Sequence, residues 1–105
     1  MELDEKTLAE IVQRILSVTR PERIILFGSA AAGNMTPDSD VDLLIVAPDA
    51  EKARKERPAI RRTLRGLGPS FDILVISKKW YEESKDVIGG LAYPATKYGR
   101  VIYVA

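Results

Sequence analysis

Phe27-Gly28-Ser29 is followed, after ten further residues, by Asp40-Val41-Asp42, and these two stretches decide the fold of the chain. Each borders an apolar run: Ile24-Ile25-Leu26 precedes the first, and Leu43-Leu44-Ile45-Val46 follows the second. Short apolar runs bounded by turn residues are typical of buried strands. The sequence therefore predicts one strand that ends at Phe27 and another that begins at Val41.

One helix is predicted before this pair of strands in the sequence, and another after it. Residues 4–18 carry apolar side chains at helical spacing, and Thr7-Leu8-Ala9-Glu10 resembles a capping box. Pro48-Asp49 caps a second helical segment that runs towards Gly66, and Pro58 is expected to break or kink it.

The other segments complete a small layered fold. Residues 71–76 form a third apolar strand, residues 78–98 are largely helical with interruptions at Gly89-Gly90 and Pro94, and residues 100–104 form a last strand. Ala30-Ala31-Ala32 is expected to be a short helical turn, and residues 36–39 a loop. The order helix, strand, strand, helix, strand, helix, strand indicates an α/β (α+β) fold in a single domain, residues 1–105.

Composition narrows the chemistry. The chain contains 0 Cys and 0 His, which excludes disulfides, Cys/His zinc sites, thiol nucleophiles and His-based triads. Any metal site must use oxygen ligands, which favours Mg²⁺, Mn²⁺ or Ca²⁺. The net charge of +1 makes nucleic-acid binding an unexpected role for the whole protein. We expect no membrane segment or signal peptide, and a cytoplasmic location by default.

Three carboxylates are the candidate catalytic and metal-binding residues. Asp40 and Asp42 lie two positions apart in an extended chain, so their side chains point to the same side, and Asp72 heads the next apolar strand. A cluster of unpaired carboxylates repels itself, and divalent cations relieve that repulsion. Two cations about 3.5–4 Å apart can hold the attacking and leaving oxygens of a phosphoryl transfer. The pattern therefore predicts two Mg²⁺ ions that Asp40 and Asp42 both bridge. Asp72 is expected to ligate only the ion that activates the attacking hydroxyl, and to accept the proton of that hydroxyl.

Gly28 and Ser29 are the candidate nucleotide-binding residues. Glycine allows the backbone to approach a phosphate closely, and the Ser29 hydroxyl can donate to the β- or γ-phosphate. A P-loop is excluded because Gly-x-x-x-x-Gly-Lys does not occur. A phosphoaspartate hydrolase is disfavoured because its Asp-x-Asp follows its strand, whereas here the pair precedes the strand.

The combined pattern resembles the signature of the DNA polymerase beta-type nucleotidyltransferase superfamily. Gly28-Ser29, the ten-residue gap and Asp40-Val41-Asp42 carry the resemblance, with Phe71-Asp72-Ile73 as the third acidic strand. Within that superfamily the short chain is most similar to the minimal nucleotidyltransferases, some of which are antitoxins. The resemblance implies a palm-like mixed sheet of about four strands flanked by helices.

The resemblance also implies an activity and a partner. Such enzymes use magnesium to move a nucleoside monophosphate, commonly AMP from ATP, onto a hydroxyl. Minimal members often pair with a small helical HEPN-type protein, and some add AMP to a tyrosine of that toxin. Many relatives carry arginines after the Gly-Ser pair, where this chain has Ala30 and Ala32.

Two other functions are kept as alternatives. One is a binding module that neutralises or scaffolds a partner protein without turnover. The other is nucleotidyl transfer to a small molecule such as an aminoglycoside, with the acceptor site completed by a dimer. A homo- or hetero-oligomer is compatible with each of these functions. Less distinctive readings also stay open. Asp72 alone is compatible with a solvent-facing strand end. Residues 52–65 form a basic segment that is either a solvated helix face or a surface for an acidic partner or RNA. The aromatic residues of the C-terminal third are expected in the core, with stacking on a nucleobase as the alternative for one of them; they are Trp80, Tyr81, Tyr93, Tyr98 and Tyr103.

Overall fold

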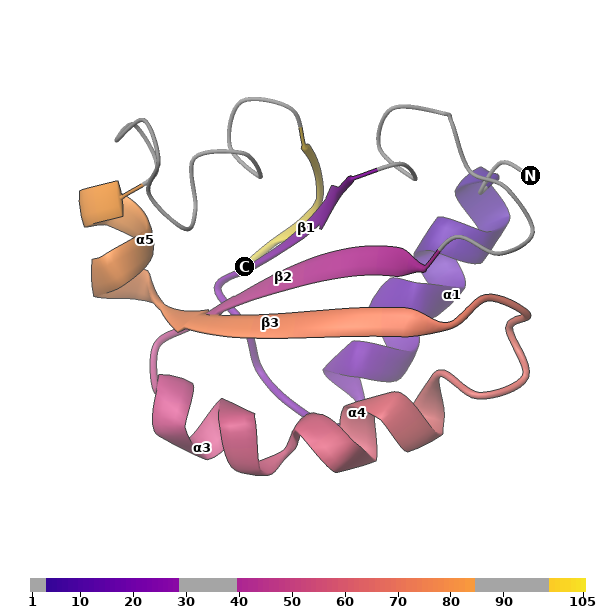
Figure 1. Cartoon of the computed structure of the whole chain (residues 1–105), viewed down its shortest axis with the longest axis horizontal. Helices are drawn as coiled ribbons and strands as arrows, with labels where there is room; N and C mark the ends of the chain where they lie inside the picture. The colour runs from indigo at the N-terminus through magenta and orange to yellow at the C-terminus, as the bar shows by residue number, and fades with distance from the viewer. Residues whose placement is uncertain (1–3, 29–39, 85–98) are drawn as a thin grey trace.

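The computed structural model describes residues 4–28, 40–84 and 99–105. These residues form one four-stranded sheet with helices on both of its faces (Figure 1). In chain order the elements are α1 (Glu5–Leu16), β1 (Arg23–Phe27), β2 (Val41–Ala47), α3 (Ala50–Lys55), α4 (Arg57–Thr63), β3 (Phe71–Ser77), α5 (Lys78–Ser84) and β4 (Arg100–Val104). The α/β architecture and the strands predicted from the sequence are confirmed.

The sheet is mixed, with the strand order β3-β2-β1-β4. Strand β1 is antiparallel to β2 and to β4, whereas β2 and β3 are parallel. A parallel pair requires a long crossover connection, and α3 and α4 form it here. Because of this arrangement, the C-terminal end of β1 and the starts of β2 and β3 lie at the same end of the sheet.

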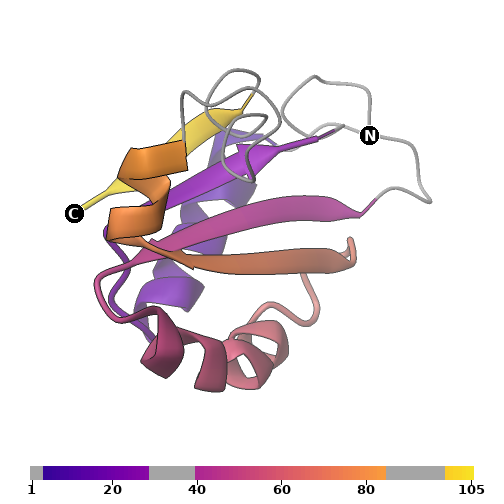
Figure 2. The same ribbon diagram turned by 60° about the vertical axis from the view of Figure 1, so that its left-hand side comes forward.

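Alternating side chains of the strands build two apolar layers. On one face, Val41, Leu43 and Ile45 of β2 pack with α1, α3 and α4 in the larger cluster. On the other face, Leu44 and Val46 pack in a smaller cluster that contains Tyr81 of α5. Figures 1 and 2 show α5 on the face of the sheet opposite to α3 and α4. Successive side chains of β2 therefore point to opposite faces of the sheet, and both faces are covered.

The N-terminal cap of α1 differs from the prediction. The N-cap is Asp4, whose side chain accepts a hydrogen bond of 2.7 Å from the backbone N–H of Thr7. The prediction of a capping box at Thr7-Leu8-Ala9-Glu10 was therefore wrong. An aspartate one turn earlier is the better acceptor for the free N–H groups of the first turn. Glu10 forms an ion pair of 3.0 Å with Arg14 instead.

The predicted second helix is divided in two. Asp49 caps α3 by accepting a hydrogen bond of 3.1 Å from the N–H of Lys52, as expected. The helix ends before Glu56 and resumes as α4, with Pro58 in its first turn. Proline is tolerated there because the N–H groups of a first turn have no partner within the helix. The predicted break at Pro58 is confirmed.

Other predictions have mixed outcomes. Tyr81 is buried, but Trp80 is 45% exposed, so its place in the core was wrong. Adjacent residues of a helix point in different directions, and only one of this pair can face the sheet. The predicted turn at residues 30–32, the loop at residues 36–39 and the helical content of residues 85–98 lie outside the described residues. Within the described segments, no helix has the length and apolar character to cross a membrane.

Candidate functional site

Two of the three candidate carboxylates lie opposite one another. Asp42 of β2 and Asp72 of β3 are register partners in the parallel pair, and Phe27 of β1 is the register partner of Asp42 on the other side. Figure 1 shows β2 and β3 starting side by side at one end of the sheet. The buried neighbours Val41 and Leu43 face α1, α3 and α4, so the side chain of Asp42 lies on the other face of the sheet.

Asp40 stands immediately before β2 and is exposed, as is Asp72, whereas Asp42 is half-buried. Burial raises the pKa of Asp42, and the negative charges of Asp72 and then Asp40 raise it further. The negative charges of Asp72 and Asp40 therefore act on Asp42 at this end of the sheet. Such mutual repulsion is the electrostatic condition under which a bound cation stabilises the site.

Gly28 lies against Asp42. The backbone of Gly28 has a φ of 72°, in the left-handed region that glycine adopts readily. A Cβ atom added at this position would overlap Oδ2 of Asp42 and would lie 3.2 Å from its Cγ. Glycine is therefore required here for its backbone angle and for the space that the carboxylate occupies. Ser29, the other candidate nucleotide-binding residue, lies outside the described residues.

The donor set suits a hard divalent cation in its chemistry. Asp42 and Asp72 present carboxylate oxygens from matched positions, and Mg²⁺ prefers oxygen ligands. Within residues 4–28, 40–84 and 99–105, no three Asp or Glu side chains are placed as a ready group of metal ligands. Asp42 and Asp72 thus have the chemistry to hold a cation between them. In the described residues, no third carboxylate is placed to ligate the same cation.

A well-formed cavity of the molecule lies away from the carboxylates of the candidate site. A cavity of about 390 Å³ lies between α1 and β4 and is lined by apolar side chains such as Leu8 and Val12, together with Glu5 and Arg100. Among the described residues that line this cavity, Glu5 is the only one with a carboxylate, and it is paired with Arg100 at 2.6 Å. Paired exposed charges are poorly suited to binding metal or phosphate. We therefore locate the candidate chemistry at the carboxylates.

Two features of the site were missed in the sequence. The first is Phe27, which lies beside Asp42 in register and packs with the smaller apolar cluster. Its position directly before Gly28 was the available signal. The second is the contact between Gly28 and Asp42, which links the two motifs through space. The strand register, which sequence alone did not fix, creates both features.

Comparison with known sequences identifies a family and one relative. The model of the nucleotidyltransferase domain family matches residues 5–93. MJ1305 of Methanocaldococcus jannaschii, which is described as a protein adenylyltransferase, is 37% identical over 68 residues. That match covers 59% of this chain and 46% of the relative, so the chain spans about half the length of the curated protein it resembles.

Comparison with solved structures gives the same fold. A toxin–antitoxin crystal structure with AMP-PNP matches 93% of this chain and 73% of its own chain, with a TM-score of 0.70 and 18% identity. A crystal structure from Sulfolobus solfataricus, described as that of a nucleotidyltransferase, matches 94% of this chain and 78% of its own chain, with a TM-score of 0.60 and 22% identity.

Proposed function

Because the chain belongs to the nucleotidyltransferase domain family, we propose that it transfers a nucleoside monophosphate, AMP from ATP, to a hydroxyl group of a partner protein in a Mg²⁺-dependent reaction. The observation that carries the proposal is the register of Asp42 opposite Asp72, with Gly28 against Asp42. The adenylyltransferase relative supports the choice of AMP, and the toxin–antitoxin neighbour supports a protein partner. A small helical protein of the HEPN type is the partner we propose.

In the proposed reaction, the acceptor oxygen attacks the α-phosphorus of the triphosphate. A bond forms between these two atoms, the bond from the α-phosphorus to the bridging oxygen breaks, and pyrophosphate leaves. Asp72 accepts the proton of the attacking hydroxyl, because it is the exposed carboxylate beside Asp42. Gly28 allows the backbone to approach the triphosphate, and Ser29 donates to a phosphate oxygen.

Asp40, Asp42 and Asp72 are the residues that would hold the two magnesium ions. Bound there, the ions would neutralise the phosphate oxygens and the charge that develops on the leaving group. Asp42 is the central member of the set, because its pKa responds to the charges of both other carboxylates. Its loss should therefore weaken cation binding most.

Calorimetric titration of ATP tests the proposal. We expect ATP to bind to the parent chain in the presence of Mg²⁺. We expect no measurable binding of ATP in EDTA, or to the Asp40→Asn/Asp42→Asn variant. The matched control is Glu51→Gln/Glu83→Gln, which removes the same charge from two exposed helical positions outside the candidate site. Equal affinity in the active-site variant and the parent chain would contradict the site assignment.

A second candidate is a binding module without turnover. It is supported by the finding that, in the described part of the chain, no three carboxylates form a ready group of metal ligands. Asp42→Asn separates the two candidates in a partner-neutralisation assay. A catalytic role predicts that neutralisation is lost while the fold is retained, whereas a binding role predicts little change.

A further inference from the structure

Five arginines of α3, α4 and the segment directly after α4 form a basic surface that the candidate site does not use. We name Arg54, Arg57, Arg61, Arg62 and Arg65 the arginine stripe. Together with Pro58 they line a cavity of about 420 Å³. Four of the five are exposed and Arg57 is half-buried. Arg57 and Arg61 are four residues apart, so they lie on one face of α4.

The guanidinium groups of the stripe are available to a partner. In the described part of the chain, none of the five arginines forms an ion pair with a carboxylate. The nearest acidic residue in sequence, Glu56, is directed elsewhere, since its Oε1 accepts the Thr19 hydroxyl at 3.4 Å. The positive charge of this surface is therefore uncompensated by the described residues.

Part of the stripe is held in place by backbone contacts. Arg54 donates to the carbonyl of Val75 at 3.4 Å and Arg57 donates to the carbonyl of Ile73 at 3.5 Å, both on the edge strand β3. Each guanidinium group has five N–H donors, so most of them remain free. These contacts reduce the side-chain entropy that a partner must overcome.

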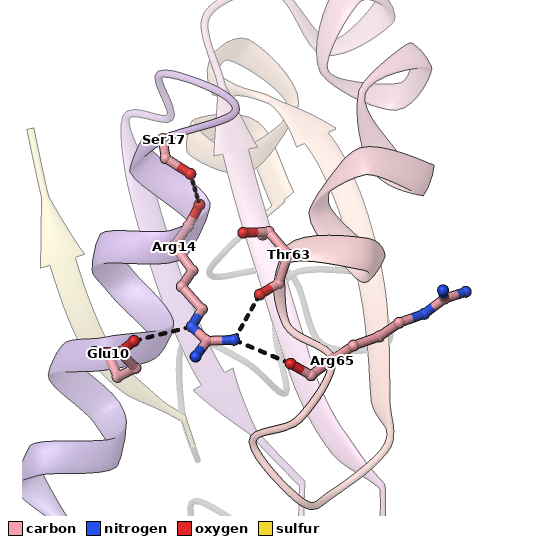
Figure 3. Close-up of polar contacts among 5 residues, drawn as sticks. All are labelled: Glu10, Arg14, Ser17, Thr63 and Arg65. Atoms are coloured by element: carbon pink, nitrogen blue, oxygen red, sulfur yellow. Dashed lines mark hydrogen bonds and ion pairs between the residues drawn. The ribbon is translucent and has the colours of Figure 1, made fainter.

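Arg14 of α1 fixes the C-terminal end of the stripe. Its Nη1 donates to the carbonyl of Thr63 at 2.9 Å and to the carbonyl of Arg65 at 3.0 Å (Figure 3). These carbonyls lie at the end of α4, where they have no partner within the helix. Figure 3 shows the side chain of Arg65 extending away from Arg14. The backbone of Arg65 is thus anchored while its charged group remains exposed.

The stripe leads to the end of the sheet that carries the candidate site. Arg61 and Arg65 also line a second cavity, of about 390 Å³, whose other walls include Ser70 and Phe71. Phe71 immediately precedes Asp72 in β3. A segment bound along the stripe would therefore extend towards the strand that carries Asp72.

We propose that the arginine stripe binds an acidic segment of a partner protein. Arginine matches carboxylates with paired, charge-assisted hydrogen bonds, which favours an acidic polypeptide. Single-stranded nucleic acid is disfavoured because binding it uses aromatic side chains for base stacking, and the stripe cavity is lined by arginines and one proline. The sequence pI of about 8.0 also lies below the range typical of nucleic-acid-binding domains. A bound segment that extends towards Asp72 could carry the acceptor hydroxyl; that step rests on the function proposed above, whereas the binding of the segment does not.

Fluorescence anisotropy of a labelled oligoglutamate peptide tests this proposal without nucleotide or metal. We expect saturable binding that weakens with added salt, and a loss of affinity of about tenfold or more in Arg61→Gln/Arg62→Gln/Arg65→Gln. The matched control is Lys6→Gln/Arg20→Gln/Lys79→Gln, which removes the same charge from exposed positions outside the stripe. The control variant should bind oligoglutamate with an affinity within about twofold of that of the parent chain, since it changes only the non-specific attraction between the peptide and the net charge of the protein.

Three outcomes would overturn the proposal. They are the absence of binding, equal loss in the control variant, and tighter binding of single-stranded RNA than of oligoglutamate at equal salt. Circular dichroism of both variants establishes that each is folded. Repeating the titration with Asp42→Asn separates this proposal from the catalytic one, because peptide binding should persist when nucleotide binding is lost.

Discussion

The carboxylate of Asp42 occupies the space beside the Cα of Gly28 in which a side chain of residue 28 would lie. The strand that ends at Phe27 and the strand that begins at Val41 are antiparallel, and their register brings these two residues together. A substitution at Gly28 would therefore be unfavourable for two reasons: the positive φ of the backbone and the lack of space for a side chain.

Gly28→Ala should therefore destabilise the chain and weaken ATP binding. We expect the free energy of unfolding in urea to fall by about 2 kcal/mol or more, because the alanine takes a positive φ and displaces the Asp42 carboxylate. Gly66→Ala is the matched control, since Gly66 has a φ of 88° and nothing within 4 Å of an added Cβ. That variant should lose about 1 kcal/mol from backbone strain alone. Equal losses would contradict the steric contribution of Asp42.

Asp42→Asn should stabilise the fold at neutral pH in buffer without divalent cations. The pKa of Asp42 is raised in the folded chain, chiefly by burial and then by Asp72 and Asp40, so ionisation of Asp42 favours unfolding. The free energy of unfolding should thus fall as the pH rises from the ordinary pKa of 3.8 through the raised value. We expect Asp42→Asn to gain roughly 0.5 kcal/mol at pH 7 after solvent screening. The gain should vanish below the ordinary pKa, where residue 42 is protonated in both the folded and the unfolded chain.

Asp72→Asn should slow the proposed nucleotidyl transfer while it leaves the binding of ATP largely intact. The variant should retain ATP affinity within about tenfold, while the rate of pyrophosphate release with an acceptor protein falls by about 10²-fold or more. Asp42→Asn should lose both properties, because Asp42 is central to the carboxylate set. Full turnover by Asp72→Asn would show that another group accepts the proton.

Arg14→Ala should destabilise the fold through the end of α4. The variant removes charge-assisted hydrogen bonds to the carbonyls of Thr63 and Arg65, so the free energy of unfolding should fall by about 1.5–3 kcal/mol. Arg100→Ala removes an ion pair with Glu5 between exposed side chains and should cost less than about 1 kcal/mol. Chemical denaturation of both variants at equal ionic strength provides the comparison.

Local sequence pattern predicted most of the fold. The strands at residues 23–27 and 41–47 followed from apolar runs between turn residues, and the break between α3 and α4 followed from Pro58. The N-cap of α1 was misplaced because Asp4 and Thr7 are both acceptable caps, and only the three-dimensional hydrogen bond distinguishes them. Trp80 was misplaced because an aromatic residue gives no information on which helix face meets the sheet.

The sequence indicated candidate residues for the site but did not predict how they lie relative to one another. Because side chains alternate along a strand, Asp42 points to the face of the sheet opposite to that of Val41 and Leu43. The parallel register of β2 and β3 brings Asp72 beside Asp42. Sequence alone could not supply the closeness of Gly28 to Asp42, which depends on the antiparallel register of β1 and β2. The role of Arg14 was also missed, because its acceptors are backbone carbonyls 49 and 51 residues away.

The contacts of Arg54 and Arg57 with β3 also bear on self-association. Strand β3 is an edge of the sheet, and the unpaired carbonyls of an edge strand are templates for pairing with another chain. The two guanidinium groups occupy the carbonyls of Val75 and Ile73 and place positive charge along this edge. Two copies of the chain approaching edge to edge would therefore meet like charges before their strands could pair. The same arginines thus protect the chain against aggregation through β3.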